Sequence, residues 1–182
     1  MAFPFKGQVL KWFESYLQDR KQFVMIDGVK SVVKDLHFGV PQGSVLGSIL
    51  YSLHISPQGE IVRHHGLVFH LYADDTQPYF AFRPTAAEQQ ASSARIEACV
   101  SLVDSWLVRN KLKLNRGKTE LLTLSASHRP RPPIDAIQVS SERIIPARSA
   151  GNIGVILHQE IFLDEQVTNT CKTCFFSFQE YS

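Results

Sequence analysis

Two adjacent aspartates, Asp74 and Asp75, interrupt a stretch of sequence that otherwise favours β-structure. Residues 67–72 before them form a nearly continuous apolar run, and β-favouring residues resume over 79–82. Neighbouring side chains of a regular strand point to opposite faces, so both carboxylates can serve one site only where the backbone turns. The pattern therefore predicts a strand over 67–72 that is buried on both faces, followed by a hairpin tip that carries the two carboxylates.

Paired carboxylates held at a hairpin tip suit a magnesium ion. Mg²⁺ binds one or two protein carboxylates and completes its octahedron with water and substrate phosphates. Aspartate is also a common turn residue with no ligand at all, and the dipeptide alone leaves both interpretations open. A further hypothesis is an unrelated Mg²⁺-dependent phosphohydrolase that uses Asp74 and Asp75, although no nucleophile or general-acid motif lies near them in the sequence.

A loop with two glycines and a proline, at residues 39–44, precedes the aspartates in the chain. Glycine lets the backbone approach a ligand closely, and the free N–H groups at the start of a following helix favour an anion. The apolar spacing after the loop predicts a helix that starts at Val45, with Ser44 as its N-cap, and that Pro57 and Gly59 end. A purely structural turn between a strand and a helix has the same composition.

Helical periodicity predicts three further helices, at residues 9–20, 85–107 and 163–178. Thr85, with Glu88 three residues later, forms a capping-box pattern at the start of the second of these helices. We expect this long helix to pack on the sheet that contains the strand before Asp74.

Turn and strand signals complete the expected fold. Asp27-Gly28 lies between two β-prone runs and predicts a hairpin. Short strands are expected at residues 111–114, 120–124, 136–139, 143–145 and 154–157. Helices and short strands in this order predict an α+β fold.

The overall charge says little about partners. The formal net charge of the 182 residues is +2, which neither demands nor excludes a nucleic acid. One stretch is locally basic and would suit phosphates, although a solvated surface is the more common meaning of such a stretch. It comprises Lys111, Lys113, Arg116, Lys118, Arg129 and Arg131. No apolar run reaches the ~18 residues of a membrane span, and the first residues lack a secretory signal, so we expect an intracellular protein without a membrane partner.

Three motifs, taken in order, resemble one family. They are GVPQGSVLG at residues 39–47, YADD at residues 72–75, and LKLN at residues 112–115 with KTE at residues 118–120. In this order and at these spacings they resemble the reverse transcriptase domain of LINE-type, non-LTR retrotransposons. The resemblance extends to the helix with Trp12 and to GVIL at residues 154–157.

The resemblance implies a role for each matching residue. Asp74 and Asp75 would be the catalytic, metal-binding carboxylates at the tip of the palm hairpin, with Asp74 the more direct ligand of Mg²⁺ or Mn²⁺. Tyr72 and Ala73 would shape the hairpin against the primer end. Lys118 would lie near the triphosphate and assist the departure of pyrophosphate.

The same family implies the partners and the architecture. Pro41, Gln42 and Gly43 would line the pocket for the template and the incoming nucleotide, and residues 154–157 resemble the primer grip. An RNA template, a DNA primer and deoxynucleoside triphosphates would be the partners, in the nucleus or the cytoplasm. The expected architecture is a polymerase palm-like antiparallel sheet with helices packed on one face.

Some expected parts have no counterpart. Two-metal phosphoryl transfer in the family uses a third carboxylate, on a palm strand upstream of the helix with Trp12, and the remaining aspartates of the chain match it poorly. Pro78 and His158 also depart from the family pattern. We therefore expect a domain fragment that is inactive alone, with incomplete fingers and no thumb. The alternative is a non-catalytic nucleic-acid-binding remnant.

The expected divisions of the chain follow from these matches. Residues 1–127 would be the partial fingers and palm, and residues 128–133 a Pro-rich linker loop. Residues 134–182 would be the lower edge of the palm and the start of the following connection.

Overall fold

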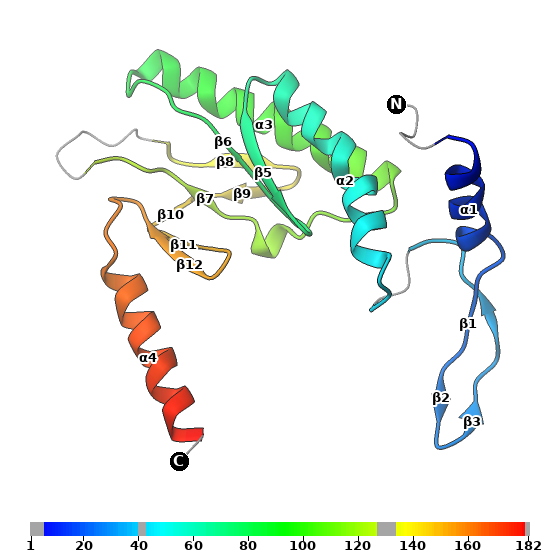
Figure 1. The fold of residues 1–182 in the computed structure, drawn as a ribbon. Helices are drawn as coiled ribbons and strands as arrows, with labels where there is room; N and C mark the ends of the chain where they lie inside the picture. The colour runs from blue at the N-terminus through cyan, green and yellow to red at the C-terminus, as the bar shows by residue number, and fades with distance from the viewer. Residues whose placement is uncertain (1–5, 40–42, 127–133, 181–182) are drawn as a thin grey trace. The chain divides into compact units, whose positions relative to one another are not determined.

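The computed structural model describes residues 6–39, 43–126 and 134–180 (Figure 1). Pro41, Gln42 and the expected linker at 128–133 lie outside these ranges. The chain forms two compact units, one of Met1–Gly59 with Leu71–Asp75 and one of Glu60–His70 with Thr76–Ser182. Helices and short, mostly antiparallel strand pairs make up both, so the predicted α+β class is confirmed.

The first unit begins with a helix and a ribbon of short strands. Helix α1 spans Gln8–Leu17 and buries Phe13, while the rings of Trp12 and Tyr16 stack with centroids 5.8 Å apart. Its start lies within one residue of the predicted start at 9. Its end at Leu17 falls three residues before the predicted end at 20.

Antiparallel pairing then forms the predicted hairpin. Strands β2 (Met25–Ile26) and β3 (Val29–Lys30) pair across Asp27-Gly28, and β1 (Lys21–Gln22) pairs with β4 (Lys34–Asp35). Asp27 and Gly28 both have positive φ, 48° and 81°, as a two-residue type I′ turn requires.

Helix α2 spans Gly47–His64 and continues through Pro57 and Gly59. The predicted end at these residues is therefore wrong. Proline removes the backbone donor that would bond to the carbonyl of Leu53, but the hydroxyl of Ser56 donates to that carbonyl at 2.9 Å. The freed carbonyl thus keeps a partner, which lowers the cost of proline inside the helix.

Strands β5 (Val68–Tyr72) and β6 (Asp75–Tyr79) form the hairpin that carries the aspartates. Burial on both faces of the first strand was a wrong prediction, because its residues alternate between exposed and half-buried. The second strand begins at Asp75 and not at 79, and it includes Pro78. Within the described residues β6 pairs with β5 alone, and an edge position of this kind tolerates a residue without an N–H.

Helix α3 (Ala86–Arg109) begins with the predicted cap. The hydroxyl of Thr85 accepts a hydrogen bond from the backbone N–H of Glu88 at 3.3 Å. The Glu88 carboxylate bonds back to the N–H of Arg83 at 2.8 Å rather than to that of Thr85. Two backbone donors at the helix start are thereby satisfied.

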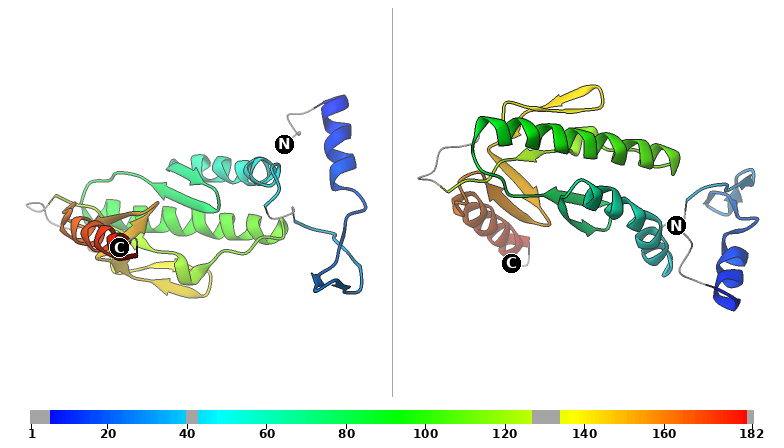
Figure 2. Two further views of the ribbon diagram at one scale, coloured as in Figure 1. Left: turned by 60° about the horizontal axis from the view of Figure 1, so that its bottom comes forward. Right: turned by 90° about the horizontal axis from the view of Figure 1, so that it is seen from above.

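The core of the second unit lies between α3 and strand β8 (Ile137–Val139), which pairs with β9 (Glu142–Ile144). Ile137 and Val139 are buried, and partly buried Ile96 and Val100 of α3 pack against them. In both views of Figure 2 the green helix α3 lies beside the yellow β8–β9 hairpin. We predicted that α3 would pack on the strand before Asp74, and its main partner is β8 instead. The alternation of β8 explains this, because Gln138 faces solvent while both neighbours present one apolar face.

The rest of the second unit consists of short elements. Residues 111–114 form no strand, and Arg116–Lys118 form a single 3₁₀ turn, η1. The remaining elements are β7 (Leu121–Leu122), parallel to β10 (Pro146–Ala147), β11 (Ser149–Asn152), antiparallel to β12 (Val155–His158), and α4 (Asp164–Glu180). Within the described ranges no helix is long and apolar enough to cross a membrane.

Truncating the core should destabilise the protein far more than truncating a surface valine. Val139 is fully buried, so Val139→Ala loses its hydrophobic burial and leaves a cavity, at a cost of about 2 kcal/mol of unfolding free energy. Val108 on α3 is 61% exposed, and Val108→Ala should change the unfolding free energy by less than about 0.5 kcal/mol. Urea denaturation measures both, and equal losses would contradict the assignment of the core.

Candidate functional site

The two aspartates lie at the predicted turn between paired strands. Ala73 and Asp74 form the turn, and Asp75 is the first residue of β6. Ala73 has a φ of 52°, the positive value that two-residue hairpin turns require at their first position. This conformation costs a non-glycine residue roughly 1–2 kcal/mol. Both carboxylates are exposed at the tip, where solvent, a cation or a substrate can reach them.

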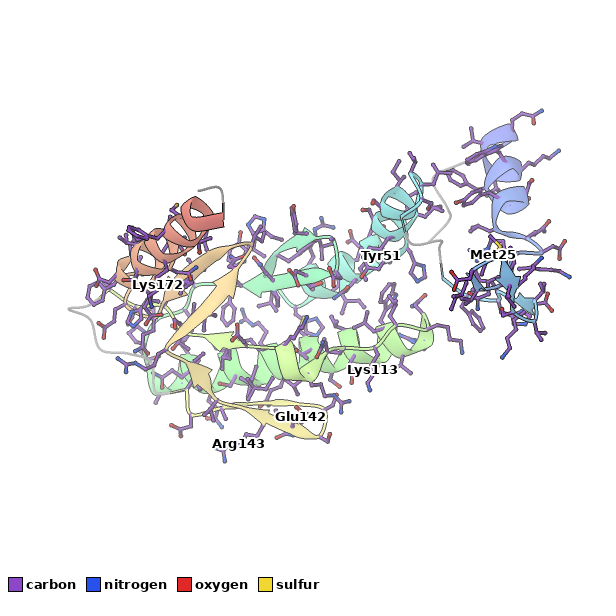
Figure 3. The ribbon with its side chains drawn as sticks, turned by 90° about the horizontal axis from the view of Figure 1, so that it is seen from below. Met25, Tyr51, Lys113, Glu142, Arg143 and Lys172 are labelled. Carbon is purple, nitrogen blue, oxygen red and sulfur yellow. The ribbon has the colours of Figure 1, made fainter. Side chains whose placement is uncertain are left out.

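Tyr51 lies on α2 (Figure 3), and the charge of Asp74 at this tip affects its pKa. Burial raises the pKa of the Tyr51 phenol, and the negative charge of Asp74 raises it further. The Tyr51 phenol is therefore protonated and neutral at neutral pH. Sequence analysis did not identify Tyr51, because the two residues are far apart in the chain and no local pattern marks their electrostatic interaction.

Tyr72 and Gly43, which were also predicted for this site, lie in the same unit as Asp74 and Asp75. Tyr72 ends β5 and is 61% exposed. Gly43 has a φ of 77° in open surroundings, so its glycine supplies a backbone conformation that other residues rarely adopt. The rest of the predicted nucleotide pocket, Pro41 and Gln42, lies outside the described residues.

Lys118 belongs to the second unit and ends the η1 turn, with its side chain exposed. The basic stretch around it is only partly available to a ligand. Lys111 and Lys113 are exposed, whereas Arg116 forms an ion pair with Asp104 at 3.4 Å. Arg129 and Arg131 fall in the part of the chain that is not described.

Two further contacts, both between residues of the second unit, stabilise the part of the β5–β6 hairpin that lies in that unit. The imidazole Nε2 of His70 and the hydroxyl of Tyr79 lie 3.0 Å apart, and the two rings stack. The side-chain amide of Gln77 donates to the side-chain oxygen of Asn152. These residues join β5 to β6 and β6 to β11, and sequence analysis did not identify them because each contact joins different strands.

The donor set at the tip suits a hard divalent cation. Two neighbouring carboxylates supply the one or two protein oxygens that Mg²⁺ takes when phosphates and water complete its shell. Among the described residues no group of three or more His, Cys, Asp or Glu side chains is placed to hold a metal ion. Asp74 and Asp75, the two exposed carboxylates at the tip, are the candidate metal ligands.

Sequence comparison identifies the class of this protein. A family model for "Reverse transcriptase (RNA-dependent DNA polymerase)" matches residues 1–158. The chain belongs to this reverse transcriptase family, and the resemblance found in its motifs is confirmed.

Two curated relatives are RNA-directed DNA polymerases, one of them described as probable, of mobile elements from Drosophila melanogaster. The chain is 27% identical to the RNA-directed DNA polymerase from mobile element jockey over 171 residues, which cover 91% of the chain and 18% of the relative. It is 27% identical to the probable polymerase from transposon X-element over 159 residues, with coverages of 86% and 17%. The chain thus spans less than a fifth of the length of these relatives. No solved structure matches it significantly.

Removing the charge of Asp74 should lower the pKa of Tyr51. In Asp74→Asn the electrostatic cause disappears while the larger cause, burial, remains, so the pKa should fall but stay above 10.0. Titration of the tyrosine ring signals by NMR measures the shift. Asp75→Asn is the matched control and should leave the Tyr51 pKa closer to that of the unsubstituted chain. An equal response to both substitutions would contradict a specific field from Asp74.

Proposed function

We propose that this chain carries the catalytic hairpin of a retrotransposon reverse transcriptase and takes part in RNA-templated nucleotidyl transfer. One observation carries the proposal: the family's paired aspartates stand exposed at a tight turn between two strands. The substrates would be an RNA template, a DNA primer and deoxynucleoside triphosphates. The relatives that match almost the whole chain are described as RNA-directed DNA polymerases.

Asp74 and Asp75 would hold the divalent cation in this proposal. Bound Mg²⁺ or Mn²⁺ supplies the activation of the primer hydroxyl and neutralises the charge of the triphosphate. Asp74 is the more direct ligand and Asp75 the second. The left-handed turn at Ala73 keeps both carboxylates at one tip, so little rearrangement is needed when a cation binds.

Tyr72 would contact the primer end, and Lys118 would contact the triphosphate. The exposed ring of Tyr72, next to the turn, offers a surface against the primer end. The exposed ammonium of Lys118 would bind the triphosphate and give a proton to the leaving pyrophosphate. Gly43, together with Pro41 and Gln42, would line the nucleotide and template pocket.

We further propose that these 182 residues do not polymerise by themselves. Nucleotidyl transfer in this family uses three carboxylates, and the chain contributes two of them at the hairpin. Two carboxylates in place of three would bind the cation more weakly. The cation that activates the primer hydroxyl would then be held less firmly.

Mn²⁺ should bind at the hairpin and broaden nearby NMR signals. Paramagnetic broadening falls steeply with distance, so the ring signals of Tyr51 and Tyr72 should broaden before those of Tyr16 in α1. Asp74→Asn should abolish the selectivity, because it removes the more direct ligand. Uniform broadening of all tyrosines in the unsubstituted chain would count against a metal site at Asp74.

Primer extension tests the catalytic part of the proposal. The 182-residue chain should add no nucleotides to a DNA primer on an RNA template with Mg²⁺ or Mn²⁺, since it supplies two of the three carboxylates. A reverse transcriptase of known activity serves as the positive control for the substrates. Templated synthesis that Asp74→Asn abolishes would refute inactivity while supporting the role of the hairpin.

A second candidate function is non-catalytic nucleic-acid binding. Lys111 and Lys113 are exposed and alternate with the half-buried Leu112 and Leu114, so this segment turns two lysines toward solvent. Binding of single-stranded RNA should then weaken steeply with salt. Lys111→Gln with Lys113→Gln should reduce the slope of log affinity against log salt by about 1.4. A slope that does not change would reject this surface as the binding site.

A further inference from the structure

We propose that Asp104 and Arg116 form a positioning pair that fixes the turn carrying Lys118, the residue whose ammonium is proposed to bind the triphosphate. The inference rests on the proposed role of Lys118 and deepens it. It assigns a role to two residues that the family motifs do not contain.

Asp104 is the common acceptor of a small hydrogen-bond network. It lies on α3 with 16% of its side chain exposed, and its Oδ2 accepts from the Nη2 of Arg116 at 3.4 Å. The hydroxyl of Ser140 donates to the same oxygen. A carboxylate that accepts from two donors on a long helix is held in one orientation, because moving it would break both bonds.

Arg116 joins three elements through one guanidinium. Its Nη2 contacts Asp104 on α3, and its Nη1 donates to the hydroxyl of Ser141 at 3.2 Å. Ser140 and Ser141 form the turn between β8 and β9, and β8 packs against α3. The side chain of Arg116 is therefore held by two elements that pack together, and this restricts the movement of the turn that carries it.

The turn transmits this anchoring over two residues to Lys118. The N–H of Lys118 donates to the carbonyl of Asn115 at 3.2 Å, and the N–H of Thr119 donates to the carbonyl of Arg116 at 3.0 Å. The hydroxyl of Thr119 adds a bond to the Asn115 carbonyl at 2.9 Å. With these bonds closed, the Cα of Lys118 cannot shift without moving Arg116.

The side chains of Arg116 and Lys118 have different surroundings and therefore different roles. Both terminal nitrogens of Arg116 are taken by protein groups, so this arginine is poorly placed to bind phosphate itself. Its Nε is buried with no hydrogen-bond partner, an arrangement that stability alone would not favour. Lys118 is exposed and forms no ion pair with any described residue. The arginine is the anchor, and the lysine is the group left available to a ligand.

A double-mutant cycle on nucleotide binding tests the pair. The affinity of the full chain for Mg²⁺–dTTP is measured by NMR titration for Lys118→Ala, Arg116→Ala, Asp104→Asn and the double variant Arg116→Ala with Lys118→Ala. Lys118→Ala should weaken dTTP about fivefold, the size expected of one exposed charge contact. Arg116→Ala and Asp104→Asn should weaken it by up to the same factor, and the double variant should be no weaker than Lys118→Ala.

Matched controls separate positioning from loss of structure. Lys172→Ala on α4 removes an exposed positive charge elsewhere and should leave the dTTP affinity unchanged. Binding of thymidine, which has no phosphate, should not respond to any variant. Arg116→Lys keeps the charge but loses the fork that reaches both Asp104 and Ser141, so it should weaken dTTP as Arg116→Ala does. Urea denaturation identifies any variant that is not folded.

The outcomes distinguish this inference from the proposed function. If the unsubstituted chain does not bind dTTP, or if Lys118→Ala has no effect, the role of Lys118 fails and the positioning pair fails with it. If Lys118→Ala weakens dTTP but Arg116→Lys and Asp104→Asn do not, the role of Lys118 stands and the positioning pair is overturned. Additive losses in the double variant would overturn it as well.

Discussion

The reversal of the chain at Ala73 and Asp74 is the constraint on which the candidate site depends. Two neighbouring aspartates in a straight strand would face opposite sides of a sheet. The left-handed backbone of Ala73 turns the chain instead, so both carboxylates stand at one tip. The pairing of β5 with β6 and the contact between His70 and Tyr79 offset the conformational cost of that turn. Any cation chemistry of this chain follows from that local geometry.

Helix α3 contributes both to the core of the second unit and to the hydrogen bonds that hold Arg116. Ile96 and Val100 on one side of the helix pack against the buried side chains of β8. Asp104, one helical turn further on, holds Arg116 and the hydroxyl of Ser140. Burial of the apolar side fixes where α3 lies against β8. The polar network therefore starts from a helix that is packed on the core, and Arg116 links the turn that ends at Lys118 to that helix.

Local signals in the sequence were sufficient for several features whose physical cause is local. The turn at Asp27-Gly28, the Thr85 cap and the reversal before Asp75 lie where they were predicted, because a few neighbouring residues decide each of them. The end of α2 was wrong, since the Ser56 hydroxyl compensates for Pro57 and a rule that treats proline alone omits it. Strand burial and the partner of α3 were wrong because both depend on contacts between distant segments.

By itself, the sequence determined the family, the order of the motifs and the residues that carry charge to the hairpin tip. Only the tertiary structure decided which of these residues are free and which are engaged. Arg116 belongs to the basic stretch in the sequence, yet Asp104 and Ser141 take its guanidinium and leave Lys118 exposed. Tyr51 has no motif, yet it lies where the charge of Asp74 acts on it. The reason is physical: the types of residue set the possible chemistry, whereas burial and partners, which arise from folding, determine which groups can use it.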